Sequence, residues 1–212
     1  ILKSISNSIA YQNWREPKTK LGIAIIIGSI PILFAGILIK LFWHNFDSSF
    51  LRSIPSIGIV SIISAIFLYI SERVGSKEKT INKVSGADGL IIGLSQVLAL
   101  IPGASRSGIT LSTALIKGWK REDAARFSFL IGIPAITLAG LVELKNALLS
   151  EFAVNTSIIP LSVGIASSAI VSWISIDWLI KYLQKNNAAI FIQYRLFFGL
   201  LTLTWWGWKI YN

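Results

Sequence analysis

The segment "GLIIGLSQVLALIPGASRSGITLSTALI", residues 89–116, is apolar along most of its length but holds a proline and an arginine near its middle. Pro102 and Gly103 interrupt a helix at this point, and Gly108 is a second expected breaker. Each half contains 13 residues or fewer, which reach only about 20 Å at about 1.5 Å per residue. The hydrocarbon core of a bilayer is about 30 Å thick, so neither half can cross it alone. We therefore expect a helix-break-helix hairpin over 89–116.

The composition around this segment is that of a polytopic, all-α membrane protein. The chain has 212 residues, of which 53% are hydrophobic and 14% charged, a balance too apolar for a soluble domain of this length. Four segments are long enough to span a bilayer, and 55–71 is close to the lower limit; the four are 21–43, 127–144, 157–180 and 189–211. We expect about five transmembrane helices and the hairpin, in one membrane domain over 1–212.

The basic residues indicate how these segments are oriented. The net charge is +10, and the Lys and Arg residues lie in short clusters between apolar segments. This distribution suits anionic lipid headgroups and the positive-inside rule better than a nucleic-acid partner. The loops 1–20, 72–88 and 117–126 hold four Lys or Arg residues each, whereas 44–54 holds only Arg52. All three basic loops lie in the cytoplasm only if 89–116 enters the membrane and returns to the same side, which predicts a re-entrant hairpin.

The residues after the break predict an anion site. Ser105, Arg106 and Ser107 directly precede the second half-helix, so its free backbone N–H groups and positive dipole end lie beside a guanidinium and two hydroxyls. A guanidinium matches phosphate oxygens with a planar fork of donors. Phosphate or diphosphate is the expected ligand. The alternative is that Arg106 pairs with a carboxylate of another span and is purely structural.

The positions of further polar residues predict their roles. Arg106 and Ser105 are the candidate catalytic residues, and the candidate substrate-binding residues are Ser107, Gly103, Gly108, Thr110 and Gln96. Asp88 is expected to be an N-cap at the cytoplasmic surface. Arg195 is expected to extend to the cytoplasmic face of its span. The chain has no cysteine and one histidine, which excludes thiolate and polyhistidine metal sites within it.

Three strings carry a family resemblance: "DGLIIGLSQVLALIPGASRSGIT" at 88–110, "KREDAARFSFLIGIPA" at 120–135 and "QYRLFFG" at 193–199. They resemble the undecaprenyl-diphosphatase family, the bacitracin-resistance type of membrane phosphatase. The resemblance implies hydrolysis of undecaprenyl diphosphate, a polyprenyl diphosphate lipid, to the monophosphate in the bacterial plasma membrane, which recycles the lipid carrier for cell-wall synthesis. It also implies two inverted repeats, each led by a re-entrant hairpin, with a cavity open to the outer side. Ser105, Arg106, Ser107 and Thr110 fall on the family's second signature.

The family's first signature, which has paired glutamates, matches no segment of this chain. We therefore expect an N-terminal part to be lacking and the chain alone to be inactive, because the ligands of the divalent cation that supports the family's activity, Mg²⁺ or Ca²⁺, are expected mainly there. An anion or lipid transporter, or a flippase, is the alternative function, since broken helices also build such sites. Whether the protein forms a homodimer is left open.

Overall fold

The structure is a computed structural model that describes residues 16–43, 45–149 and 158–211. These residues form seven α-helices: α2 (Pro17–Phe42), α3 (Ile54–Val74), α4 (Gly86–Gln96), α5 (Arg106–Ile116), α6 (Arg121–Leu149), α8 (Ile158–Lys185) and α9 (Ala189–Tyr211). Short 3₁₀ turns lie at η1 (Phe46–Ser48), η2 (Phe50–Arg52), η3 (Ile81–Lys83) and η4 (Val97–Leu100). Within the described ranges the only β pairing is one isolated bridge. The predicted all-α class is confirmed.

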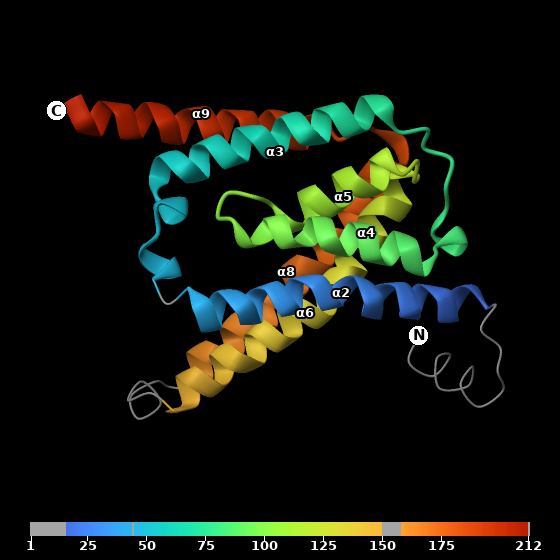
Figure 1. The fold of residues 1–212 in the computed structure, drawn as a ribbon, viewed down its shortest axis with the longest axis horizontal. Helices are drawn as coiled ribbons and strands as arrows, with labels where there is room; N and C mark the ends of the chain where they lie inside the picture. Colours follow the sequence, from blue (N-terminus) through green and yellow to red (C-terminus); the bar gives the residue numbers. More distant parts are fainter. Residues whose placement is uncertain (1–15, 44, 150–157, 212) are drawn as a thin grey trace.

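The short helices α4 and α5 lie inside the arrangement, between longer ones (Figure 1). α2 packs along α4 on one side, and α3 packs against α5 on the other, while α6 contacts both α2 and α5. α9 runs beside α3 along its length (Figure 1). The interrupted segment is therefore surrounded by protein, the condition under which irregular backbone is tolerated at membrane depth.

Four of the described helices are long and apolar enough to cross a bilayer. They cover Pro17–Phe42, Ile54–Val74, Arg121–Asn146 and Ile159–Lys185, and they correspond to the predicted spans 21–43, 55–71, 127–144 and 157–180. The segment 189–211 forms α9 as a helix, but it is not one of these four, so its crossing stays a prediction.

The break falls where Pro102 and Gly103 predict it. α4 ends at Gln96, η4 follows, and α5 begins at Arg106. Gly103 has φ +91°, a conformation that costs residues with a Cβ. The expected break at Gly108 is wrong, because Gly108 is the third residue of α5 and its N–H donates to Ser105 Oγ at 3.1 Å. A glycine in the first helical turn is held by the cap and does not interrupt the helix.

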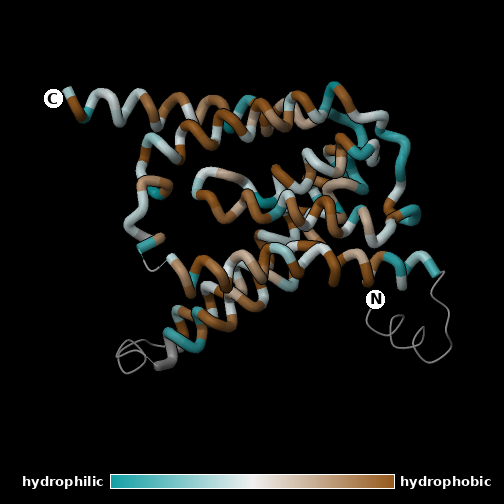
Figure 2. Tube along the Cα trace, viewed as in Figure 1, coloured by the Kyte–Doolittle hydropathy of each residue, from teal (hydrophilic) through white to brown (hydrophobic). Residues whose placement is uncertain are grey.

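Hydrophilic residues gather at one end of the molecule, where α2 begins and α3 leads into residues 75–85 (Figure 2). Glu72 connects three elements at this end. Its carboxylate accepts hydrogen bonds from Arg121 Nε at 3.0 Å and Arg121 Nη2 at 2.8 Å, and another from the Ala188 N–H at 3.0 Å. Glu72 thus ties the end of α3 to the starts of α6 and α9.

Asp88 stabilises the start of α4 at the same end. Ser85 is the N-cap, and Asp88, three residues later, completes a capping box, so the expectation that Asp88 itself caps the helix is wrong. Lys79 Nζ donates to Asp88 Oδ2 at 2.5 Å. Burial alone would raise the pKa of Asp88, but the hydrogen bonds from Lys79 and Ser85 outweigh it and hold that pKa below its usual value.

The Glu72 contact generates a stability prediction. Glu72→Gln removes the charge from a carboxylate that is 9% exposed, so we expect the free energy of unfolding to fall by about 2–3 kcal/mol. Asp177→Asn is the matched control, because the Asp177–Lys181 pair is 53% and 70% exposed and contributes about 0.5 kcal/mol or less. Thermal unfolding followed by tryptophan fluorescence in detergent measures both. Equal melting temperatures for the two variants would contradict the role of Glu72.

The turn generates a second prediction. A Cβ at Gly103 would stand 2.5 Å from the Ile57 carbonyl oxygen of α3 and would have to adopt a positive φ, so Gly103→Ala should cost about 1–3 kcal/mol of stability. The control is Gly140→Ala within α6, where a Cβ meets no atom within 4 Å and alanine favours the helix. The same unfolding assay reports both, and an unaltered Gly103→Ala protein would show that the turn can relax.

Candidate functional site

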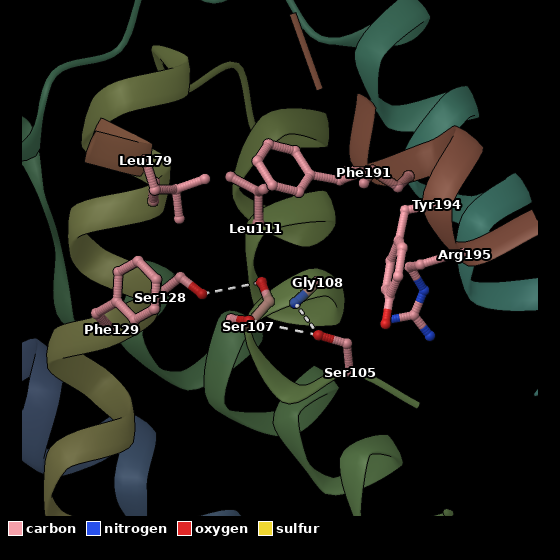
Figure 3. A pocket seen from close by; sticks show the side chains of 12 residues that line it. Ser105, Ser107, Gly108, Leu111, Ser128, Phe129, Leu179, Phe191, Tyr194 and Arg195 are labelled. Atoms are coloured by element: carbon pink, nitrogen blue, oxygen red, sulfur yellow. Dashed lines mark hydrogen bonds between the residues drawn. The ribbon is translucent and has the colours of Figure 1, made fainter. Parts of the chain in front are cut away.

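A cavity of about 230 Å³ lies beside the first turn of α5. Its lining divides into two parts (Figure 3). Serine hydroxyls, the backbone of Gly108 and the Arg195 guanidinium lie toward one end, whereas Leu111, Leu179 and Phe191 lie toward the other (Figure 3). The polar groups of the lining therefore gather at one end, where Phe129 lies beside Ser128 (Figure 3), and the rest of the lining is apolar.

The polar end is organised by the N-terminus of α5. Ser105 is the N-cap, and its hydroxyl accepts from the Gly108 N–H. The Ser105 and Ser107 hydroxyl oxygens lie 3.4 Å apart, and Ser128 Oγ of α6 donates to the Ser107 carbonyl at 3.0 Å. The first N–H groups of a helix have no acceptor within it, and the helix dipole is positive there. This end of the cavity is built to receive negative charge.

The structure brings three of the predicted site residues to this cavity, namely Ser105, Ser107 and Gly108. Thr110 lies elsewhere, because it is fully buried and its Oγ1 is 2.9 Å from the Arg106 carbonyl oxygen and 2.5 Å from Ser128 Oγ. These contacts hold α5 against α6. A contact between Thr110 and substrate stays a prediction.

Arg106 does not line the cavity. Its guanidinium lies against Gly132 of α6, so closely that a Cβ at Gly132 would occupy the same space. Among the described residues Arg106 has no carboxylate in salt-bridge distance, and its Nη1 is buried without a hydrogen-bond partner. The structural alternative, a pair with an acidic residue of another span, therefore finds no support in this part of the chain.

Gln96 has a similar property at the end of α4. Its side chain is fully buried, and neither amide atom has a hydrogen-bond partner among the described residues. A buried polar group without a partner costs about 1–3 kcal/mol, and native structures hold few of them. Arg106 and Gln96 flank the same break, so these atoms without partners lie beside the predicted anion site. Two others among the described residues, Ser53 Oγ and Trp119 Nε1, lie outside the break.

Arg195 is the site residue that sequence reasoning placed wrongly. Its side chain does not run to the start of its helix: it lines the cavity, and its Nη2 donates to the Gly103 carbonyl at 2.6 Å. The reason is tertiary, because α9 packs along α3 and α3 contacts α5, which brings Arg195 to the turn. The available signal was an arginine seven residues into an apolar helix, since such residues usually mark functional sites.

The described residues do not form a site for a divalent cation. They contain no group of three or more His, Cys, Asp and Glu side chains that could hold a metal ion, and the lining of the cavity holds no carboxylate. Divalent cations such as Mg²⁺ and Ca²⁺ require several oxygen ligands, usually carboxylates. No step through a metal follows from these residues.

Comparisons with known proteins agree with the resemblance. The family described as "Bacitracin resistance protein BacA" matches residues 1–201. The chain is 56% identical over 206 residues to the undecaprenyl-diphosphatase of Prochlorococcus marinus (strain MIT 9303), covering 97% of this chain and 70% of that protein. It is 55% identical over 207 residues to the undecaprenyl-diphosphatase of Synechococcus sp. (strain WH7803), covering 98% and 72%. These matches give no support to the expectation that an N-terminal part is lacking. The chain belongs to the BacA family.

Proposed function

We propose that this protein hydrolyses undecaprenyl diphosphate to undecaprenyl phosphate and phosphate, and so recycles the lipid carrier used in cell-wall synthesis. Several relatives at 52–56% identity carry the name undecaprenyl-diphosphatase, which makes this chain a hydrolase of the same kind. The substrate is a membrane lipid, in agreement with the four apolar helices.

The observation that carries the proposal is the division of the cavity into a polar and an apolar end. A polyprenyl diphosphate has the same division, with a strongly charged headgroup joined to a hydrocarbon chain. The helix N-terminus, Ser105 and Ser107 offer donors to the headgroup. Leu179 and Phe191 offer apolar surface to the chain.

The predicted residues then have distinct roles in the reaction. Hydrolysis breaks the phosphoanhydride bond, and negative charge on the phosphoryl oxygens is stabilised by fixed donors and cations. Arg106 and Ser105 are assigned to this stabilisation. Ser107 and Gly108, which line the cavity, are assigned to the headgroup. Gly103, Thr110 and Gln96 do not line it, so substrate would have to reach them beyond the cavity wall.

The placement in the membrane belongs to the same proposal. In this proposal the protein lies in the inner membrane of a bacterium, and helices α4 and α5 form a re-entrant hairpin. The end of the molecule where the hydrophilic residues gather (Figure 2) faces the cytoplasm. The supporting observation is that basic residues collect at this end, among them Arg73, Lys79, Lys117 and Arg121, as the positive-inside rule requires. The cavity opens to the outer side, as the resemblance implies.

A transporter or flippase that uses the same broken helix is the second candidate function, and family membership does not favour it. Phosphate release from undecaprenyl diphosphate, measured beside anion uptake into proteoliposomes, separates the two. The proposal requires release without uptake. The dependence of release on Mg²⁺ or Ca²⁺, which the resemblance implies, is tested by chelation with EDTA in the same assay.

Arg106→Ala tests the assignment of the signature arginine. We expect phosphate release to fall by about 100-fold or more, the usual cost of losing one fixed donor to a charged transition state. Arg106→Lys should recover only part of this loss, because an ammonium group lacks the planar fork. Arg126→Ala is the control, since Arg126 lies on α6 with its side chain 46% exposed. Near-normal release by Arg106→Ala would remove Arg106 from the reaction.

A further inference from the structure

We propose that Arg195 is a second substrate-binding arginine, whose guanidinium binds a phosphate group of the diphosphate at the start of α5. The proposal rests on the proposed function and adds to it a residue that lies outside the 101–110 string. Four observations lead to it: the position of the guanidinium, its unpaired charge, the remaining donors, and the different direction taken by Arg106.

The first observation is the position of the Arg195 guanidinium. Arg195 Nη2 donates to the Gly103 carbonyl at 2.6 Å, and Nη1 lies 3.5 Å from the point that a Cβ on Gly108 would occupy. The guanidinium therefore reaches from the turn to the first turn of α5. Figure 3 shows Ser105, Gly108 and Arg195 in the same region of the cavity. A phosphate that accepts from the N-terminus of α5 would meet this guanidinium as well.

The charge of Arg195 is uncompensated. No Asp or Glu lines the cavity, and none of the ion pairs in the described ranges includes Arg195. Neighbours on its own helix and on α8 are Tyr194, Phe191 and Leu179, and α5 and α6 contribute hydroxyls and apolar side chains. A cation removed from water without a counterion is costly. An anionic ligand would offset that cost.

The guanidinium also keeps donors for a ligand. One N–H is used by the Gly103 carbonyl, while Nε is buried without a partner. A guanidinium carries several N–H donors in a rigid plane, and this plane suits the oxygens of a phosphate. The hydrogen bond to Gly103 fixes the orientation of the plane before substrate arrives, so less rotamer entropy is lost on binding.

The two arginines of the site point to different places. The Arg106 guanidinium lies against Gly132 of α6, whereas Arg195 lines the cavity and donates to the Gly103 carbonyl of the turn. The cation that the cavity itself presents is thus supplied by α9. A diphosphate has two phosphate groups, and Arg195 provides for one of them independently of Arg106.

A purely structural role is the competing explanation, because the bond to Gly103 also braces the turn. A brace would change stability or the turnover number kcat and leave the affinity for a free headgroup unaltered. A ligand contact would change that affinity, whatever the loss of the bond to Gly103 does to stability. Inorganic pyrophosphate is the probe, since it carries the headgroup chemistry without the lipid chain.

The experiment compares wild type, Arg195→Gln, Arg195→Lys and the control Arg73→Gln, whose arginine is exposed on α3 and lies over the Tyr69 ring. For each protein we would measure KM and kcat for undecaprenyl diphosphate, the inhibition constant of inorganic pyrophosphate, and the melting temperature. In Arg195→Gln we expect KM and the inhibition constant to rise by about tenfold or more, the effect of one lost charge-assisted hydrogen bond. Arg195→Lys should lie between, and Arg73→Gln should match wild type.

Two results would overturn the proposal. One is a lower melting temperature or kcat in Arg195→Gln with KM and the inhibition constant unaltered, which identifies a brace. The other is no difference from wild type. If Arg195→Gln does not fold, KM and the inhibition constant of Arg195→Lys decide instead, because lysine keeps the charge and nearly the length. Both constants equal to those of wild type would overturn the proposal.

Failure of the proposed function has a different signature. If wild type releases no phosphate, pyrophosphate binding by isothermal titration calorimetry still tests Arg195. Binding to wild type that weakens about tenfold or more in Arg195→Gln supports the anion contact without the hydrolase. Equal pyrophosphate binding by wild type and Arg195→Gln would show that Arg195 does not contact the anion.

Discussion

A helix that stops in an apolar interior leaves backbone N–H and C=O groups that water cannot reach, and the break between α4 and α5 has to satisfy them. The turn does so with local and distant partners. The Ala104 N–H donates to the Ile101 carbonyl, and Ser105 caps α5. The Gly103 carbonyl receives a guanidinium from α9. The packing of α2 and α3 around α4 and α5 encloses this turn. These backbone groups are satisfied by protein, whereas donors of Arg106 and Arg195 have no partner among the described residues and are free for a ligand.

Charge is treated differently at the hydrophilic end of the described structure and at the break between α4 and α5. At the hydrophilic end, carboxylates are matched: Glu72 with Arg121, and Asp88 with Lys79 and Lys117. These pairs join segments distant in sequence and fix where α4, α6 and α9 begin. At the break, Arg106 and Arg195 have no acidic partner among the described residues. Paired charges stabilise the frame, whereas the unpaired arginines leave a field that favours an anion.

The cavity places the turn and its unpaired arginine beside an apolar lining. Its polar end uses the N-terminus of α5, and its other end uses leucine and phenylalanine side chains of α5, α8 and α9. Such a site can hold a charged headgroup without separating it from its hydrocarbon chain. For an enzyme that acts on a lipid, this removes the need to extract the whole substrate into water, which would cost about 0.8 kcal/mol for each buried CH₂ group.

Local chemistry in the sequence was sufficient to predict the long helices and the break. The apolar lengths predicted the long helices. Pro102 and Gly103 predicted the break, because the restrictions on proline and the freedom of glycine act within one or two residues. The cap of α5 by Ser105 and the pair of Asp177 with Lys181 likewise join groups only three or four positions apart, so local spacing governs them. The roles of Gly108 and Asp88 were predicted wrongly, because the residues three positions earlier, Ser105 and Ser85, cap the two helices.

Which arginine faces the cavity depends on the packing of distant helices. Arg106 and Arg195 lie 89 positions apart in the printed sequence, counted from 106 to 195, and no local rule relates them. Long side chains have many rotamers, and the choice depends on what packs nearby. Gly132 leaves room for the guanidinium of Arg106 beside α6, and the contact between α3 and α9 carries Arg195 to Gly103. Local sequence patterns specify where the helices run and where the chain breaks between α4 and α5. The packing of separate helices specifies which side chains meet at the break.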